Sequence, residues 1–314
     1  MILKRKTMIL KRKRTRFRSE DWQQYSMCVI PVLLVFLFNY VPMFGVVIAF
    51  KNYQFDKGIF GSAWVGFKNF EFLLDSNQFA RITYNTLSLN FIMIIVGILA
   101  ALTVAILLYQ LRSVRAIKVY QTILITPHFL SWVIVGYMAY AFLNPSYGLM
   151  NHILESLGFH AIDYYSRPDI WPAILTLASV WKHVGLDCVI YYAALVGIDT
   201  TLFEAAEVDG ANRWRVVRSI ILPGLLPLVV ILTILKIGGI FRADFGLFYQ
   251  LTRDVGALYA TTDVIDTYIF RTMRVIGDMG MSSAAGLLQS VVGFVMVVVA
   301  NKLSKKIDAD GGLF

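Results

Sequence analysis

Six long apolar stretches constrain the fold of this chain more than any other feature of its sequence. A helix needs about 20 largely apolar residues to cross the hydrocarbon core of a bilayer. Because backbone polar groups must find partners within the chain in lipid, stretches of this length favour helices. They predict an all-α, polytopic membrane protein with six transmembrane helices, at about Ser26–Phe50, Thr86–Leu111, Tyr120–Leu143, Trp171–Val196, Ser219–Ile240 and Ala284–Leu303.

Composition agrees with a chain that faces lipid, since 58% of its residues are hydrophobic and 16% are charged. Its net charge of +9 equals the excess of 29 basic over 20 acidic residues, and nine Lys and Arg without any acid lie in Met1–Arg18. A basic tail before a membrane span is typical of an orientation signal held by anionic lipid. We therefore expect membrane lipid, and no nucleic acid, as a partner.

The basic residues of the short loops predict the orientation. Cytoplasmic loops carry an excess of Lys and Arg, which places both termini and both short loops in the cytoplasm. The segments 51–85, 144–170 and 241–283 are then outside. The first of these segments is rich in aromatic residues. They form either an interfacial aromatic belt or a folded outer surface on which another protein docks. The basic clusters are Arg112, Arg115 and Lys118; Arg213, Arg215 and Arg218; and Lys302, Lys305 and Lys306.

One of the short loops carries a conspicuous motif, Glu204-Ala205-Ala206-Glu207-Val208-Asp209-Gly210, followed after nine residues by Ile220-Ile221-Leu222-Pro223. Thr201 and Glu204 fit a capping box, in which the Thr201 hydroxyl caps the Glu204 amide. A short helix is predicted to run to about Asp209, where Gly210 ends it with a left-handed residue. Between two membrane spans, this helix protrudes from the bilayer and suits a soluble partner.

The motif resembles the EAA signature, E-A-A-x3-G-x9-I-x-L-P, of MetI-like permease subunits in binding-protein-dependent ABC importers. The resemblance is strongest to LplB-type permeases of the carbohydrate family, through Asn39–Pro42, Arg242–Gly246 and Thr261–Tyr268. Asp199 departs from the proline that many relatives have before this helix. The resemblance implies a type I ABC importer permease fold and import of an oligosaccharide or polysaccharide fragment across the bacterial cytoplasmic membrane.

The resemblance also implies the partners: a second homologous permease, two cytoplasmic ATPase subunits, an extracytoplasmic solute-binding protein and the sugar. ATP and Mg would be bound by the ATPases, because this chain has no G-x-x-x-x-G-K-[ST] phosphate loop. It also lacks H-E-x-x-H and G-x-S-x-G motifs, so we expect a non-enzyme with no catalytic residue, cofactor or metal. ATPase coupling is assigned to Glu204, Ala205, Ala206, Asp209, Gly210, Ile220, Leu222 and Pro223.

These features divide the chain into a basic cytoplasmic tail (1–24), a first helix with an external loop (25–82), a five-helix permease core (83–303) and a cytoplasmic tail (304–314). The core contains the short coupling helix at about 201–209. Cys28 and Cys188 both fall in apolar segments, which argues against a disulfide framework or a zinc site.

Polar residues at membrane depth are costly and usually face a bundle interior or a wet cavity. The fourth span is densest in them and is the predicted substrate path, through Trp181, Lys182, His183, Asp187, Tyr191 and Tyr192. His183 and Asp187 share a helix face. The alternative is that Lys182 and Asp187 form structural ion pairs between spans or subunits.

Other polar and small residues in the spans predict contacts between helices. We interpret Asn39, Asn90 and Gln289 as interhelical hydrogen-bonding residues. Lys236 and Arg242 are expected to snorkel to the interface or to attract an anionic sugar. The spacing of Ser282, Gly286 and Ser290 allows close helix packing, within the subunit or against the partner permease.

Three other functions stay open at this point. A permease for another solute would share the coupling loop but not the LplB-like outer segments. A secondary carrier would need acids along several spans, whereas Asp187 is nearly alone at depth. An intramembrane enzyme would need the catalytic motifs that are missing.

Overall fold

The computed structural model describes residues 19–307 and divides the chain into two compact units, Met1–Val47 and Ile48–Phe314. The basic cluster at Met1–Arg18 lies outside the described residues. In the first unit, α1 (Ser19–Val35) continues into a π-helical turn (Phe36–Tyr40). A 3₁₀ helix (Val41–Phe50) follows, and its last three residues belong to the second unit. Asn39 lies in the π-helical turn and is exposed. Side chains such as Met27 and Ile30 are also largely exposed, as expected for a helix that faces lipid.

Within residues 19–307, five helical segments are long and apolar enough to cross a membrane. They are Tyr25–Phe50, Asn77–Tyr109, Pro168–Val196, Arg213–Gly238 and Met279–Leu303. Val114–Phe129 and Trp132–Leu143 make a sixth span if the two are counted together. This confirms the prediction of a polytopic helical membrane protein.

The predicted third span, Tyr120–Leu143, is not one continuous helix, because the chain bends by 96° between Val114–Phe129 and Trp132–Leu143. α5 (Val114–Ile125) ends in a 3₁₀ turn (Thr126–Phe129) containing Pro127, and α6 (Trp132–Leu143) starts in a new direction. Leu130 and Ser131 are extended, and the Ser131 hydroxyl accepts the Ile134 amide as the N-cap of α6. Proline and a serine N-cap together favour a break over a continuous helix.

The core of the second unit forms around α4 (Asn77–Tyr109) and α8 (Trp171–Val196), which pack along each other. α5 also packs on α8, and α11 (Leu222–Gly238) packs on α15 (Met279–Ile307). A Cβ added at Gly185 would lie 2.0 Å from the Leu124 carbonyl oxygen, so glycine is what lets α8 approach α5. Cys188 is fully buried in the same region.

The segments predicted to lie outside are folded. Near the start of the second unit, β1 (Lys51–Asn52) and β2 (Ala63–Trp64) form an antiparallel hairpin that encloses α2 (Gly58–Gly61), and α3 (Lys68–Leu74) follows. Phe50 packs against Trp64, Phe67 and Phe70. Trp64 and Phe67 are still 63% and 67% exposed, so the aromatic-rich segment is only partly a packed cluster. The later segments contain α7 (Leu149–Ser156), α12 (Phe245–Thr252), α13 (Tyr259–Thr262) and α14 (Ile265–Arg271).

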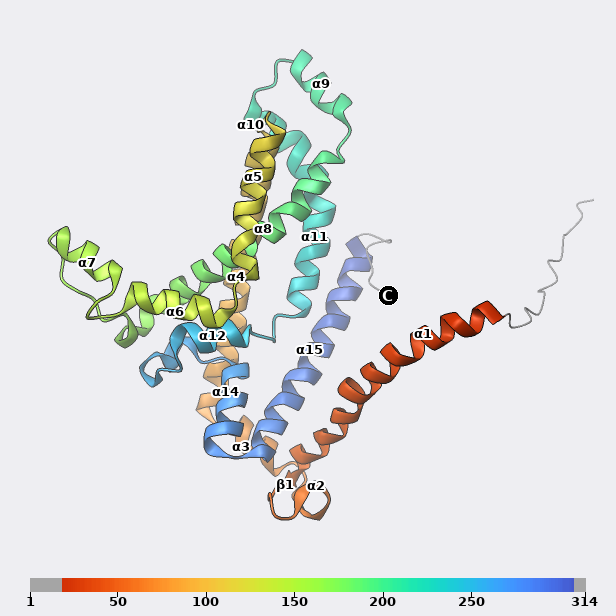
Figure 1. Ribbon diagram of the computed structural model, residues 1–314, viewed down its shortest axis with the longest axis vertical. Helices are drawn as coiled ribbons and strands as arrows, with labels where there is room; N and C mark the ends of the chain where they lie inside the picture. The colour runs from red at the N-terminus through yellow and green to blue at the C-terminus, as the bar shows by residue number, and fades with distance from the viewer. Residues whose placement is uncertain (1–18, 308–314) are drawn as a thin grey trace, which may run out of the picture. The chain divides into compact units, whose positions relative to one another are not determined.

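The motif-bearing loop forms α9 (Thr200–Val208) and α10 (Arg213–Val216), and a π-helical turn (Val217–Ile221) joins α10 to α11. Figure 1 shows α9 at the end of the second unit opposite β1 and α2. The small-residue stripe of α15 packs within this chain, since the Ser282 hydroxyl bonds to the Ile269 carbonyl of α14 and Gly286 faces Ile269. Ser290 is exposed.

Candidate functional site

The N-terminus of α9 is capped by Asp199. Its Oδ1 accepts the Thr201 amide at 2.9 Å. The predicted cap by the Thr201 hydroxyl is therefore wrong, because α9 begins one residue earlier, at Thr200. The backbone hydrogen bond from Thr201 lowers the pKa of the Asp199 carboxyl, which keeps the cap charged at neutral pH. An aspartate here stabilises a helix start as a proline would, but through a side-chain acceptor.

The C-terminus of α9 ends as predicted. Gly210 has a φ of +68°, and its amide donates to Glu207, while the Ala211 amide donates to Ala206 at 2.9 Å. These bonds satisfy the last carbonyls of the helix, as in a Schellman motif. Any residue with a Cβ is disfavoured in this left-handed conformation.

α9 presents most of its motif residues outward. Glu204, Ala205 and Asp209 are exposed, and Ala206 is half-buried. Phe203 points back and packs on Tyr109 at the end of α4, with ring centroids 5.7 Å apart. Farther along, Ile220 is half-buried, whereas Leu222 and Pro223 are exposed at the start of α11. The motif therefore combines an inward anchor with an exposed helical face.

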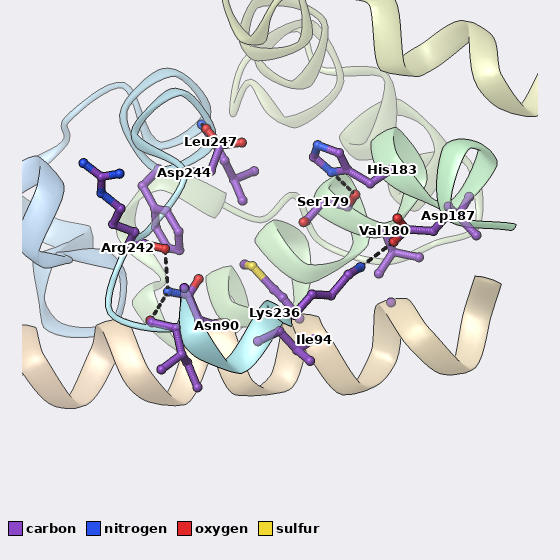
Figure 2. A pocket seen from close by; sticks show the side chains of 16 residues that line it. Asn90, Ile94, Ser179, Val180, His183, Asp187, Lys236, Arg242, Asp244 and Leu247 are labelled. Atoms are coloured by element: carbon purple, nitrogen blue, oxygen red, sulfur yellow. Dashed lines mark hydrogen bonds and ion pairs between the residues drawn. The ribbon is translucent and has the colours of Figure 1, made fainter. Parts of the chain in front are cut away.

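A cavity of about 240 Å³ lies among α4, α8, α11 and the loop that follows α11 (Figure 2). Of the six predicted path residues, His183 and Asp187 line it. Asp187 Oδ2 and Lys236 Nζ form an ion pair at 2.6 Å that joins α8 to α11. The expectation that Lys236 snorkels to the interface is thus wrong, because an acid on the neighbouring helix holds it in the cavity. The other polar lining residues are Asn90, Ser179, Arg242 and Asp244.

The remaining predicted path residues lie elsewhere. Lys182 is buried, and its Nζ donates to the carbonyls of His128, at 2.9 Å, and Leu130 at the helix break. It also lies 5.1 Å from the centre of the Trp132 ring. Among the described contacts Lys182 bonds to carbonyls and not to an acid, so the ion-pair alternative holds for Asp187 and not for Lys182.

The three aromatic residues of that set also lie outside the cavity lining. Tyr191 is buried among core residues, and Tyr192 packs edge-on to Tyr109 near α9. Trp181 is 40% exposed. The structure therefore brings together only His183 and Asp187 of the six.

Sequence reasoning missed how the loop after α11, Gly239–Asp244, is positioned. Asn90 donates to the carbonyls of Ile240, at 2.7 Å, and Arg242, and Gln289 donates to that of Phe241. These bonds confirm that Asn90 and Gln289 link separate elements. Asp266 accepts hydrogen bonds from the Ala243 amide, at 2.9 Å, and from the Gln289 side chain. Burial raises the pKa of the Asp266 carboxyl, although both hydrogen bonds act to lower this pKa. The signal in the sequence was the recurrence of polar residues in Asp263–Tyr268.

At the end of this loop, Asp244 joins two helices. Its Oδ2 accepts the Trp132 indole N–H at 2.7 Å, and its Oδ1 caps α12 by accepting the Leu247 amide. The cavity rim thus connects α11, α12 and the helix break before α6. This leaves Arg242 exposed at the rim, where Figure 2 shows its side chain extended.

A buried ion-pair network fixes the outer segment Asp254–Arg271. Arg271 pairs with Asp263 at 2.6 Å and with Asp254 at 3.2 Å, and its guanidinium lies 4.0 Å from the Tyr259 ring centre. Asn85 of α4 donates to the carbonyls of Ala260 and Asp263. These two hydrogen bonds therefore hold the outer segment Asp254–Arg271 onto α4. Within residues 19–307, no group of His, Cys, Asp and Glu side chains is arranged to hold a metal ion.

Comparison with known proteins places this architecture in a family. Residues 93–309 match the family described as binding-protein-dependent transport system inner membrane component. The chain is 34% identical to the polygalacturonan/rhamnogalacturonan transport system permease protein YteP of Bacillus subtilis (strain 168), over 96% of this chain and 94% of the relative. It is 35% identical to protein LplB of the same organism, over 90% and 89% of the two chains.

A solved structure shares the fold over most of its length. A chain from a bacterial ABC transporter involved in the import of the acidic polysaccharide alginate superposes with a TM-score of 0.83 and 33% identity. The match covers 92% of this chain and 97% of that chain. The protein is thus an integral inner-membrane protein with the type I ABC importer permease fold, and it belongs to the family of binding-protein-dependent transport system inner membrane components.

Proposed function

We propose that this chain is the permease subunit of an ATP-driven ABC importer that moves an oligosaccharide or polysaccharide fragment into the cell. The observation that carries this proposal is the match along nearly the whole chain to carbohydrate permeases and to an alginate importer. Because the named substrates of YteP and of the alginate importer are rich in uronic acids, we infer that the imported sugar is acidic.

We further propose the assembly that the family implies. A second homologous permease completes the pore, two cytoplasmic ATPases bind ATP and Mg and supply the energy, and an extracytoplasmic protein delivers the sugar. An alginate importer of the same fold was solved with a pentasaccharide-bound periplasmic protein, which supports delivery by such a partner. Both termini and α9 would face the cytoplasm, where the ATPases are.

The exposed face of α9 is proposed to seat in an ATPase groove. Val208 is apolar and 89% exposed on this helix, and Glu204, four residues earlier, adds a charge beside it on the same face. Leu202 is 51% exposed on another side of the helix. Phe203 anchors the opposite face to α4 through Tyr109. A displacement of α9 would therefore be passed on to α4, which packs along α8 and lines the cavity.

We propose that His183 and Asp187 line the substrate path and that Arg242 contributes positive charge to it, since the charge of Lys236 is paired with that of Asp187. The cavity holds hydrogen-bonding groups suited to sugar hydroxyls, including Asn90 and Ser179. Lys182, Tyr191 and Tyr192 act through packing and helix positioning, as their burial and contacts indicate.

The test is reconstitution of the importer in liposomes with its partner permease, ATPases and binding protein. Uptake of a labelled uronate oligosaccharide that requires both ATP and the binding protein is expected. Uptake without the ATPases would favour a secondary carrier, and failure to transport any sugar while another solute is imported would refute the sugar assignment.

Two variants test the coupling role of α9 in the same system. Glu204→Lys changes the docking face, and Gly210→Val places a β-branched residue where φ is +68°. Both are expected to abolish stimulation of ATP hydrolysis by the loaded binding protein. Gly158→Val is the matched control, because Gly158 has a φ of +83° in a distant exposed loop. Wild-type stimulation in both α9 variants would show that this helix is not the coupling element.

A further inference from the structure

A second pocket lies between α6 and α12 and shares no lining residue with the central cavity. It measures about 190 Å³ and is lined by Val133, Gly136, Tyr137, Tyr249, Gln250 and Arg253. Pockets that enclose a drug-sized ligand measure about 300–1,000 Å³, so this one suits a single sugar unit. None of its lining residues is acidic, and one is an arginine.

Two glycines bring α6 and α12 close enough to form this pocket. A Cβ added at Gly136 would lie 2.7 Å from the Gln250 carbonyl oxygen, and one at Gly246 would lie 2.4 Å from the Trp132 ring. The ion-pair network around Arg271 fixes the turn that follows α12, through Asp254. The pocket is therefore bounded by closely packed helices and a fixed turn, and its shape is set before a ligand arrives.

The backbone at Arg253 is strained. Within residues 19–307, Arg253 and Asp254 are the non-glycine residues with a positive φ, at 55° and 51°. The energetic cost of the positive φ at Asp254 is offset by the contacts of its side chain with Arg271, at 3.2 Å, and with the Tyr259 hydroxyl, at 2.9 Å. Arg253 has no ion pair among the described residues, and its guanidinium lies 3.9 Å from the centre of the Tyr140 ring. Strain held at a ligand-facing side chain is common at binding sites.

Stacking on Tyr140 leaves the guanidinium able to bind an anion. A guanidinium that lies over an aromatic face keeps its in-plane N–H groups free, and their fork matches the two oxygens of a carboxylate. Tyr137, which is 67% exposed, offers a ring to the apolar face of a sugar. Gln250 adds amide groups that can bond to hydroxyls.

We infer that this pocket is a second sugar subsite, which binds one uronate unit through its carboxylate on Arg253. The inference rests on the proposed function, and it defines where the negative charge of the substrate is recognised outside the central cavity. The phosphate of a lipid headgroup would also pair with an arginine, so the test must separate the two sources. The tyrosine ring and the glutamine side chain favour the sugar.

The experiment measures binding of a galacturonate trisaccharide to the complete purified importer without its binding protein, by calorimetry. The carboxyl-reduced trisaccharide serves as the neutral probe. Arg253→Gln and Arg253→Gly are expected to weaken binding of the galacturonate by about 10- to 100-fold, the range for losing a charged hydrogen-bonded pair. Binding of the neutral trisaccharide should not change. Arg253→Lys should recover part of the affinity, since it restores charge without the fork.

The controls separate a structural effect from recognition. Arg253→Gly relieves the positive φ, so its complex should melt no lower than the wild type. Arg167→Gln removes a cation that is exposed and paired with Asp169 and should leave galacturonate binding unchanged. Equal galacturonate affinity in the wild type, Arg253→Gln and Arg253→Gly would overturn the inference.

Two further outcomes are distinguishable. Binding is repeated in nanodiscs of phosphatidylcholine with and without phosphatidylglycerol. If Arg253 variants lose only their response to phosphatidylglycerol, the pocket holds a lipid headgroup, and the sugar subsite is refuted. If the wild-type importer transports no sugar at all, the proposed function fails and the subsite fails with it. If the wild type and the Arg253 variants bind and transport the sugar equally well, the subsite alone is refuted.

Discussion

Replacing Lys182 with methionine should destabilise the helix break before α6. The Lys182 side chain is 6% exposed and reaches from α8 to the carbonyls of His128 and Leu130. These oxygens lie at the C-terminal end of α5 and its 3₁₀ turn, where a cation also complements the helix dipole. Methionine has a similar length and fills the space but donates no hydrogen bond.

The expected magnitude follows from the carbonyls of His128 and Leu130, because the third acceptor, the Pro127 carbonyl, keeps the Leu130 amide as a donor. A buried acceptor left without a partner costs about 1–3 kcal/mol, so the pair gives about 2–6 kcal/mol. At about 2 °C of Tm for each kcal/mol in a large chain, the melting temperature should fall by about 4–12 °C. The loss should be accompanied by reduced transport, because the break positions Trp132 against Asp244 at the cavity rim.

The assay is thermal unfolding of the purified complex in detergent, followed by tryptophan fluorescence. Lys118→Met is the control, since it removes an exposed lysine from α5, the helix that ends at the break. We expect its melting temperature to stay within about 1 °C of the wild type, as surface substitutions usually do. If the Lys182→Met complex has the same melting temperature as the wild type, the reasoning that Lys182 supplies hydrogen bonds needed by the carbonyls at the helix break is refuted.

Two further predictions concern α9 and the orientation. Asp199→Ala removes the N-cap of α9, which costs about 1 kcal/mol, and should weaken ATPase stimulation, whereas Asp199→Ser should retain it; equal stimulation in all three proteins would show that the cap is dispensable. Cysteines placed at Lys57 and Glu155, both exposed, should react with an impermeant thiol reagent from outside intact cells, and one at Arg115 should not, in a background lacking Cys28; labelling at Arg115 would reverse the proposed topology.

Local chemistry was sufficient to predict several features of this protein from its sequence. Apolar length predicts the helical spans because lipid leaves the backbone no other partner. The left-handed conformation at Gly210 follows from glycine's lack of a Cβ. The family resemblance needed only fixed residues at fixed spacing, and the comparisons confirm it.

Contacts between distant segments decided what the sequence left open. Lys182 and His183 are neighbours, yet one closes a helix break and the other lines the cavity, because they point to different sides of α8. Lys236 stays at depth because Asp187, which is 49 residues away in sequence, reaches it across a helix interface. Side-chain partners of this kind depend on how helices pack, and hydropathy along one chain carries no information about packing. The sequence by itself therefore determined that the chain is a helical membrane protein and which loop carries the EAA motif, whereas only the tertiary structure decided which polar side chains meet in the cavity.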